Sequence, residues 1–319
     1  MLSKELHLDS SSVNAILAGD IVRNISTLEQ KFDVKILSRG TLLRISSKNQ
    51  DKLDIALVAL KNLIKFHESG HHIKQKDFEI IISNSLKNLN ESNTDKDFHM
   101  ETIKVGKKNG SIIPRTQNQY SYVRDIQSKE IVFGIGPAGT GKTYLAMALA
   151  ISAFLDGKHT RIILTRPAME AGENLGFLPG TLEEKIKPYL RPLYDALYDM
   201  LEFDEANRLL ENNIIEVAPL AFMRGRTLNN SFIILDEAQN TTVEQMMMFL
   251  TRIGFESKCV ITGDPSQTDL PHNKRSGLNH ACSILKNIDE ISIIKFNSKD
   301  VVRNPLIEKI ITAYEQDKK

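Results

Sequence analysis

A glycine-rich stretch near the middle of the chain carries residue types that bind the phosphates of a nucleotide. It reads GPAGTGKT and fits the pattern G-x-x-x-x-G-K-[ST]. Its members are Gly136, Pro137, Ala138, Gly139, Thr140, Gly141, Lys142 and Thr143. The apolar run IVFGI precedes it and a helix-forming run follows, and in this context backbone N–H groups wrap phosphates. The alternative is a glycine-rich turn that binds nothing, with the spacing arising by chance.

The last two residues of the loop, Lys142 and Thr143, have side chains that can bind the outer phosphates and the metal ion of a nucleotide. We expect Lys142 to reach the β- and γ-phosphate oxygens and the Thr143 hydroxyl to ligate Mg²⁺. Guanine-specific proteins usually carry Asn-Lys-x-Asp, and the similar stretch HNKRSG lacks the Asp. The sequence therefore favours ATP with Mg²⁺.

A second motif, SFIILDEAQNTT, supplies two carboxylates. Its apolar residues 232–235 predict a buried strand that presents Asp236 and Glu237 at its carboxyl end. We expect Asp236 to orient Mg²⁺ through its water shell and Glu237 to polarise the attacking water as general base. An acidic helix cap is the alternative, but it is less attractive beside a phosphate loop. The Glu favours transfer to water over transfer to a bound substrate, so the predicted reaction is hydrolysis of ATP to ADP and phosphate.

Two glutamines complete the candidate site. In VITGDPSQTDLP, Gln267 follows a third strand and is predicted to sense the γ-phosphate, with Asp264 assisting the metal or the water. Taken alone, GDPSQ is an ordinary turn. In RTQNQYSYV, Gln119 lies about two helical turns before the first strand. Its amide is placed to bracket adenine, and a solvent-facing glutamine is the alternative.

The elements that must position these residues show the pattern of an α/β domain. Short runs rich in Ile and Val alternate with helical segments, which suits a mainly parallel sheet covered by helices. The predicted strands are IVFGI, RIILT, IIEVA, FIILD, KCVITG and ISIIKF, and the clearest helices are Leu145–Phe154, Val243–Ile253 and Val302–Tyr314.

The first part of the chain predicts a small α+β unit with the order helix, helix, strand, strand, helix. Apolar residues at helical spacing flank Gly19, and DVKILSRGTLLRISS alternates as two strands joined at Arg39 and Gly40. An amphipathic helix follows. One face of this helix carries Leu53, Ala56, Leu57, Leu60, Leu63 and Ile64.

Composition then divides the chain into three parts. We expect the α+β unit over residues 1–83, a polar and basic linker over 84–115, and the α/β domain over 116–319. The linker ends in a basic cluster that either contacts phosphates or is a solvated charge run. This cluster comprises Lys104, Lys107, Lys108 and Arg115.

Bulk properties narrow the class of protein. The net charge of +1 over 319 residues argues against a histone-like protein but leaves room for a local basic patch. The two cysteines, Cys259 and Cys282, are too few for a disulfide framework, and Cys259 lies in an apolar run that predicts burial. Neither a signal peptide nor an apolar run of about 20 residues is found. We therefore expect a cytoplasmic protein with no membrane partner.

Six separated motifs occur in an order that resembles the PhoH-like ATPase family. They are GPAGTGKT, RPAMEAGENLGFLPG, APLAFMRGRTL, FIILDEAQNTT, GDPSQTDLP and DVVRNPLIEKIITAYE, and the resemblance covers residues 119–315. It implies a RecA-like P-loop core similar to the first half of superfamily 1 helicases. The first unit resembles the KH-like domain of many family members. Its loop departs from the G-x-x-G pattern, because Gly19 is followed by Val22 at the fourth position, so RNA clamping and protein contact both stay open.

The resemblance also implies partners. The chain has room for only one such lobe after the linker. If an arginine finger completes the site, we expect a neighbouring subunit to supply it, which implies a ring or another symmetric homo-oligomer. The candidates are Arg224, Arg226, Arg275 and Arg303, of which Arg303 is favoured because VVRNPL opens the last helix. Residues 166–180 follow the second strand, where related motors contact single-stranded nucleic acid.

Three functions follow from these expectations. The preferred one is an RNA-directed, helicase-like ATPase in RNA metabolism that binds single-stranded RNA, with duplex unwinding left open. The second is an ATP-dependent switch acting on a protein partner, such as an endoribonuclease of ribosomal RNA maturation. The third, a regulatory role in phosphate starvation, is suggested only by the family name.

Overall fold

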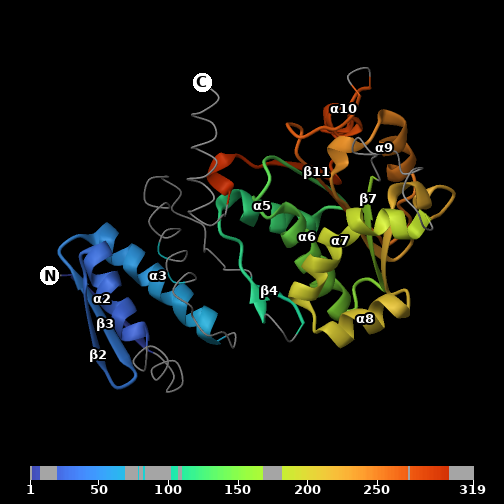
Figure 1. Cartoon of the computed structure of the whole chain (residues 1–319). Helices are drawn as coiled ribbons and strands as arrows, with labels where there is room; N and C mark the ends of the chain where they lie inside the picture. Colours follow the sequence, from blue (N-terminus) through green and yellow to red (C-terminus); the bar gives the residue numbers. More distant parts are fainter. Residues whose placement is uncertain are drawn as a thin grey trace, which may run out of the picture. The chain divides into compact units, whose positions relative to one another are not determined.

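The computed structural model describes residues 2–7, 20–68, 78, 82, 102–106, 110–167, 182–271 and 274–301. The chain forms two compact units, Met1–Thr102 and Ile103–Lys319 (Figure 1). Several predicted features lie outside the described residues. They are the linker segment 84–101, Gly19, Lys107, Lys108, most of the loop 166–180, and the helix Val302–Tyr314 with Arg303.

The first unit contains an antiparallel sheet of three strands in the order β1-β3-β2. The strands are β1 (Leu2–His7), β2 (Lys35–Arg39) and β3 (Leu42–Ser47). The predicted turn is confirmed, since β2 and β3 pair antiparallel across Gly40, whose φ of 59° suits glycine. Strand β1 was not predicted. It is an edge strand whose residues are exposed or half-buried, so it lacks the apolar alternation that reveals a strand.

The described residues of this unit include the helices α2 (Asp20–Phe32) and α3 (Gln50–Glu68). The predicted apolar face of α3 is confirmed at Leu53, Ala56 and Leu60, which are all but fully buried. Asn49 caps the start of α3, because its Oδ1 accepts a hydrogen bond from the backbone N–H of Asp51 at 2.8 Å.

The second unit is built on a six-stranded sheet in the order β11-β6-β10-β9-β7-β8. Its strands are β6 (Ile131–Ile135), β7 (Arg161–Arg166), β8 (Ile215–Pro219), β9 (Ser231–Leu235), β10 (Lys258–Gly263) and β11 (Ile291–Lys295). Every pairing is parallel, as the unalternating apolar runs predicted. The α/β fold class is therefore confirmed, with a sheet of P-loop type.

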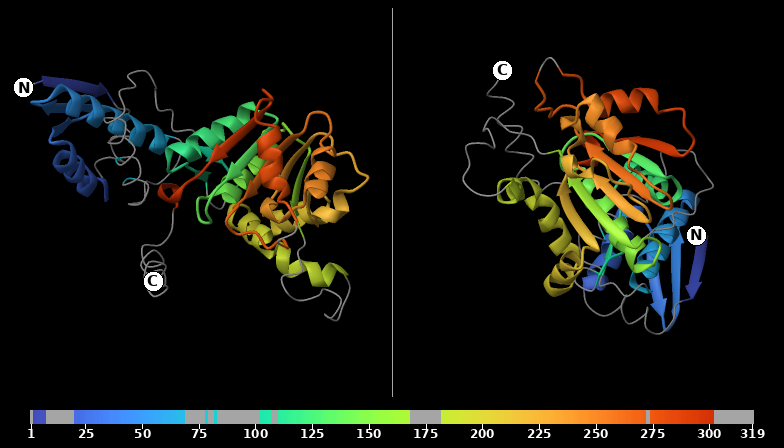
Figure 2. Two further views of the ribbon diagram at one scale, coloured as in Figure 1. Left: turned by 90° about the horizontal axis from the view of Figure 1, so that it is seen from above. Right: turned by 90° about the vertical axis from the view of Figure 1, so that its right-hand side faces the viewer.

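Helices cover both faces of this sheet (Figure 2). Successive strand residues point to opposite faces, and because the strands are apolar throughout, both faces have apolar side chains to bury. On one face, Val132, Ile162 and Val260 pack with side chains of α5, α6, α7 and α8. On the other, Phe133 and Ile261 pack with side chains of α9 and α10. These helices are α5 (Gln117–Ser128), α6 (Lys142–Leu155), α7 (Leu182–Met200), α8 (Phe203–Glu211), α9 (Val243–Leu250) and α10 (Gly277–Ile284).

Two predicted helices can be compared with these bounds. The prediction of Leu145–Phe154 is confirmed within α6. Helix α9 begins under a capping box of Thr242 and Gln245 but ends three residues before Ile253. It stops early because Ile253 leaves the helix to form a parallel bridge with Leu228.

The segment predicted as linker up to Arg115 needs correction at its second half. A short hairpin of β4 (Ile103–Lys104) and β5 (Ser111–Ile112) belongs to the second unit. Ile103 and Val105 are buried in its core, so these apolar residues hold the segment against the rest of the second unit. The second unit therefore starts at Ile103 rather than at 116.

Three further properties of the described residues bear on the expectations. No described helix is long and apolar enough to cross a membrane. Both cysteines are free thiols, and Cys259 is buried in β10 as predicted. Burial raises the pKa of the Cys282 thiol to about 11.

Candidate nucleotide site

In the loop between β6 and α6, three glycines, Gly136, Gly139 and Gly141, have a positive φ, a conformation that favours glycine. Gly136 has φ of 146°, and a Cβ there would lie 2.5 Å from the carbonyl oxygen of Phe296. Gly141 caps α6 with φ of 80°, which is a left-handed conformation. The loop therefore turns directly into a helix N-terminus, where free N–H groups and the helix dipole favour an anion.

Lys142 is the first residue of α6, and its side chain folds back over the loop. Its Nζ donates to the carbonyl oxygens of Gly136 at 2.7 Å and Pro137 at 2.8 Å, and lies 3.2 Å from Thr140 Oγ1. Only 7% of the residue is exposed. Burial lowers the pKa of this ammonium, while Asp264, Asp236 and Glu237 act in the opposite direction. The Lys142 ammonium is thus held inside the loop, and no carboxylate of the described residues pairs with it directly.

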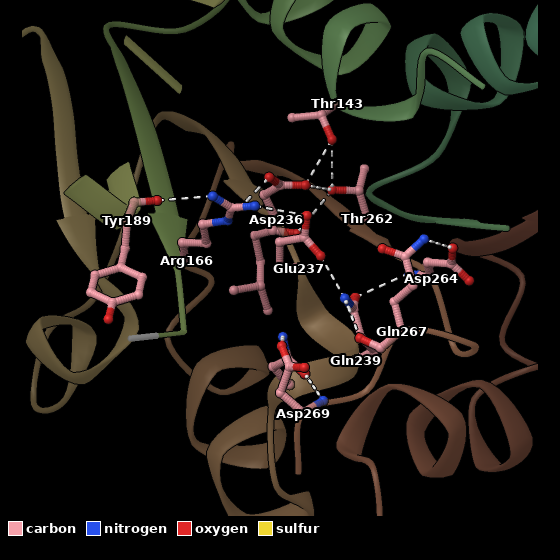
Figure 3. A network of polar contacts seen from close by, with 12 residues as sticks. Thr143, Arg166, Tyr189, Asp236, Glu237, Gln239, Thr262, Asp264, Gln267 and Asp269 are labelled. Carbon is pink, nitrogen blue, oxygen red and sulfur yellow. Dashed lines mark hydrogen bonds and ion pairs between the residues drawn. The ribbon is translucent and has the colours of Figure 1, made fainter. Parts of the chain in front are cut away.

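Three strand or helix ends converge on Asp236 (Figure 3). Its Oδ1 accepts hydrogen bonds from Thr143 Oγ1 and from Thr262 Oγ1, both at 2.7 Å. Thr143 belongs to α6, Asp236 follows β9, and Thr262 lies in β10. Neighbouring parallel strands end at the same edge, so residues 93 and 26 positions away from Asp236 meet it there.

The chemistry of this set fits Mg²⁺. The metal takes oxygen ligands and keeps several waters, so it needs only one or two protein groups beside the phosphates. A hydroxyl from Thr143 and a carboxylate from Asp236 meet that need. Among the described residues no group of three or more His, Cys, Asp or Glu is placed to hold a metal ion.

Glu237 lies beside Asp236 in sequence but points elsewhere, because its backbone is left-handed at φ of 53°. Its Oε1 accepts a hydrogen bond from Arg166 Nη2 at 2.7 Å, and its Oε2 accepts one from Gln239 Nε2. Non-glycine residues adopt this conformation seldom, and such strain clusters at functional sites. Glu237 is therefore held by specific contacts rather than exposed as a simple helix cap.

The third strand end, after β10, lies against the same network (Figure 3). Gln267 Nε2 donates to Asp264 Oδ2 at 2.9 Å. Gln239 joins this segment to Glu237, because its Oε1 accepts from the backbone N–H of Asp264 and its Nε2 donates to the Gln267 carbonyl. The structure therefore brings Gln267 and Asp264 to the edge where Asp236 and Glu237 lie.

Gln119 is buried, which excludes the solvent-facing alternative. Its Nε2 donates to the carbonyl of Thr140 at 2.9 Å, and its Oε1 accepts from the N–H of Arg115 at 2.5 Å. The amide thus braces the phosphate loop from α5, whose N-cap is Thr116. In this arrangement its role toward adenine stays a prediction.

Comparison with known proteins places this site in a family. The family model described as "PhoH-like protein" matches residues 111–315. This chain belongs to the PhoH-like protein family.

Relatives extend the match to most of the chain. The chain is 49% identical over 292 residues to the PhoH-like protein of Bacillus subtilis (strain 168), covering 92% of this chain and 91% of that one. It is 49% identical over 299 residues to the PhoH-like protein of Mycobacterium tuberculosis (strain ATCC 25618 / H37Rv), covering 93% and 84%. With Protein PhoH of Escherichia coli (strain K12) it shares 42% identity over 205 residues, or 64% of this chain and 58% of that one.

A solved structure was also compared, the Sulfolobus solfataricus SWI2/SNF2 ATPase core in complex with dsDNA. It has a TM-score of 0.34 and 16% identity over 52% of this chain and 34% of that one, which is too remote to support an inference. PhoH family membership and the P-loop-type sheet support an ATPase.

The arginines considered as fingers lie in different settings in this PhoH-like chain. Arg226 is paired with Glu216 through both carboxylate oxygens, at 2.6 and 2.7 Å, so it is committed within its own subunit. Arg224 and Arg275 are exposed, and neither makes an ion pair among the described residues. Arg303 lies outside the described residues.

Sequence reasoning missed three residues of the site, Arg166, Gln239 and Thr262. Arg166 ends the strand RIILTR and Thr262 lies inside KCVITG, so each stands at the carboxyl end of a parallel strand. That position is the signal that would have found them, because strand ends meet at one edge. Gln239 follows the acidic pair in LDEAQ but carries no motif of its own.

Proposed function

We propose that this PhoH-like chain hydrolyses ATP at the edge described above, to ADP and phosphate. The hydrogen bond between Thr143 Oγ1 and Asp236 Oδ1 at 2.7 Å carries the proposal. It joins the phosphate loop to the strand end that bears two carboxylates, which is the arrangement that nucleotide hydrolysis with Mg²⁺ requires. A phosphate-binding turn alone would not need the second strand end.

Each residue has a role in the reaction. The N–H groups of the loop and Lys142 bind the β- and γ-phosphates and offset the charge that develops on them. Mg²⁺, when bound beside Thr143 and Asp236, supplies further neutralisation of the phosphate oxygens. Glu237 accepts a proton from the attacking water as the water oxygen bonds to the γ-phosphorus. The bond from that phosphorus to the bridging oxygen breaks, and ADP leaves with the electron pair.

We further propose that ATP hydrolysis by this chain is directed at RNA. Support comes from the family resemblance and from the first unit, whose described elements run strand, helix, strand, strand, helix and whose three strands pair antiparallel, which suits a KH-like domain. In this proposal the first unit delivers single-stranded RNA to a ring of ATPase lobes, and Arg303 completes the neighbouring site. The alternative is a switch in which ATP controls binding of an endoribonuclease.

The test of RNA dependence is phosphate release by the full-length chain with increasing single-stranded RNA. We expect several-fold stimulation, with little from a duplex of the same length. A chain beginning at Ile103 should keep basal hydrolysis but lose the stimulation, since it lacks the first unit. Genuine hydrolysis with a flat response to RNA would contradict the RNA assignment and favour the protein-partner alternative.

A further inference from the structure

Arg166 lies where it can govern the candidate general base. It is the last residue of β7, and its guanidinium reaches three groups, two on the segment that follows β9 and one on α7 (Figure 3). Nη2 donates to Glu237 Oε1 at 2.7 Å, Nε lies 3.5 Å from Asp236 Oδ2, and Nη1 donates to the Tyr189 carbonyl on α7 at 2.9 Å. The side chain of Arg166 is 18% exposed, so water screens these contacts only partly.

The contacts of Arg166 fix the direction of the Glu237 carboxylate. Glu237 has a left-handed backbone and a side chain 37% exposed, so without partners it would sample several rotamers. Arg166 binds one carboxylate oxygen and Gln239 binds the other. Two donors from different elements therefore determine one orientation. A carboxylate has about four lone-pair positions, so it can still accept a hydrogen bond from water while both donors are in place.

We propose that Arg166 is a positioning residue for Glu237 and couples its orientation to helix α7. The proposal rests on the proposed hydrolysis with Glu237 as base. The rigid fork of the guanidinium holds Glu237 with one nitrogen and the Tyr189 carbonyl with another. If α7 shifts relative to β7, either the hydrogen bond from Arg166 to the Tyr189 carbonyl breaks, or Arg166 follows α7 and changes the position of the Glu237 carboxylate.

A purely structural ion pair would behave differently. Arg226 and Glu216 illustrate one, since Nη1 and Nη2 of Arg226 both donate to the carboxylate of Glu216 on β8. Arg166 instead divides its nitrogens between a backbone carbonyl of α7 and the two carboxylates at the site. This division is what a positioning residue needs, because it relates the base to a second element.

The first experiment is steady-state hydrolysis by Arg166→Gln, Arg166→Lys and the control Arg161→Gln, at the opposite end of β7. We expect Arg166→Gln to lower kcat about ten- to a hundredfold through misplacement of the base, with KM for ATP changed less than about threefold. Arg166→Lys should recover part of the loss, because it keeps the charge but not the fork. Arg161→Gln should match the wild type. An unchanged or raised kcat in Arg166→Gln would overturn the proposal.

A double-mutant cycle separates positioning from direct contact with phosphate. Because Arg166 acts through Glu237, Arg166→Gln should have no further effect on the single-turnover rate when Glu237 is already Gln. A further loss of the same factor in the Glu237→Gln background would show that Arg166 acts on the nucleotide itself. That result would also overturn the proposal.

The same variants distinguish failure of this inference from failure of the proposed function. Absence of hydrolysis by the wild type would reject the proposed function, whatever Arg166 does. The contact itself is then tested by thermal unfolding midpoints of Arg166→Gln, Glu237→Gln and the double variant. Non-additive shifts are expected for residues in direct contact, and additive shifts would overturn the Arg166–Glu237 contact without reference to activity.

Discussion

Asp236 and Glu237 are adjacent in the sequence and both lie near Arg166, but their other hydrogen-bond partners differ. Asp236 directly follows β9, and its Oδ1 accepts hydrogen bonds from the hydroxyls of Thr143 and Thr262. Glu237 turns away with φ of 53° and meets Arg166. At the scale of single residues, one carboxylate is therefore tied to the phosphate loop and the other is kept apart from it. This division matches the proposed roles of metal orientation and proton acceptance.

Replacement of the base gives the first prediction. Glu237→Gln keeps the size of the side chain and removes its ability to take a proton, so we expect kcat to fall about 10²- to 10⁴-fold. Binding of ATP should persist, because the loop and Lys142 are unchanged, and the variant should accumulate with ATP bound. Filter binding and phosphate release on the same preparation measure both. Turnover near the wild-type rate would show that Glu237 is not the base.

The sequence predicted this site unevenly, for a physical reason. The loop and the acidic pair are local motifs whose residues lie within a few positions, so spacing alone reveals them. Arg166 and Thr262 enter the site only because β7 and β10 flank β9 in the folded sheet. Strand order is set by tertiary packing, and a pattern in one segment does not contain it.

At the scale of elements, the junction of β6 and the loop gives the second prediction. Gly136 has φ of 146°, and a Cβ would stand 2.5 Å from the Phe296 carbonyl, so Gly136→Ala combines strain with a backbone clash. We expect it to cost about 1–3 kcal/mol. Gly157→Ala is the matched control, because its φ of 71° is also positive but nothing lies near its Cβ. Chemical denaturation should give a clearly larger loss for Gly136→Ala, and equal losses would contradict the structure.

His159 gives a prediction on acid stability at the start of β7. Its ring packs edge-on against Phe232, and burial lowers its pKa from the ordinary 6.5 although Nδ1 lies 3.1 Å from the Glu256 carbonyl. The unfolded chain then binds the proton more readily, so this residue favours unfolding as the pH falls below its unfolded value. Wild type should lose more thermal stability than His159→Gln between about pH 8 and about pH 5. An identical loss in both would contradict this.

Elements were predicted best where burial leaves a plain pattern. All six strands of the parallel sheet were predicted, because both faces are covered and their sequences are continuously apolar. Strand β1 has no buried face, and α7 contains Pro188 and Pro192, which are poor helix formers, so neither showed a pattern that identified it.

At the scale of the whole molecule, the proposed ring gives a prediction about shared sites. A subunit with Lys142→Ala lacks nucleotide binding but keeps Arg303, and a subunit with Arg303→Ala keeps the loop but lacks the finger. Each alone should be nearly inactive, since such a finger contributes about 10³- to 10⁵-fold in rate. Mixed in one assembly, they should recover activity at the interfaces that combine an intact loop with an intact finger.

The matched mixtures use Arg224→Ala or Arg275→Ala in place of Arg303→Ala. If the finger acts in trans, only the alanine variant of the arginine that supplies it should be inactive alone and regain activity when mixed with the Lys142→Ala subunit. Copurification through a tag on one partner verifies that mixed assemblies form. Activity no greater than the sum of the separate subunits would exclude a finger supplied between them.

The most direct test of the account is steady-state phosphate release from ATP by the purified full-length chain with Mg²⁺. Beside it stand Lys142→Ala and the control Lys158→Ala, an exposed lysine on the turn after α6. We predict clear hydrolysis by the wild type and by Lys158→Ala, and loss of both ATP binding and hydrolysis in Lys142→Ala. Phosphate release that is equal in wild type and Lys142→Ala would contradict the assignment of this loop as the site of ATP hydrolysis.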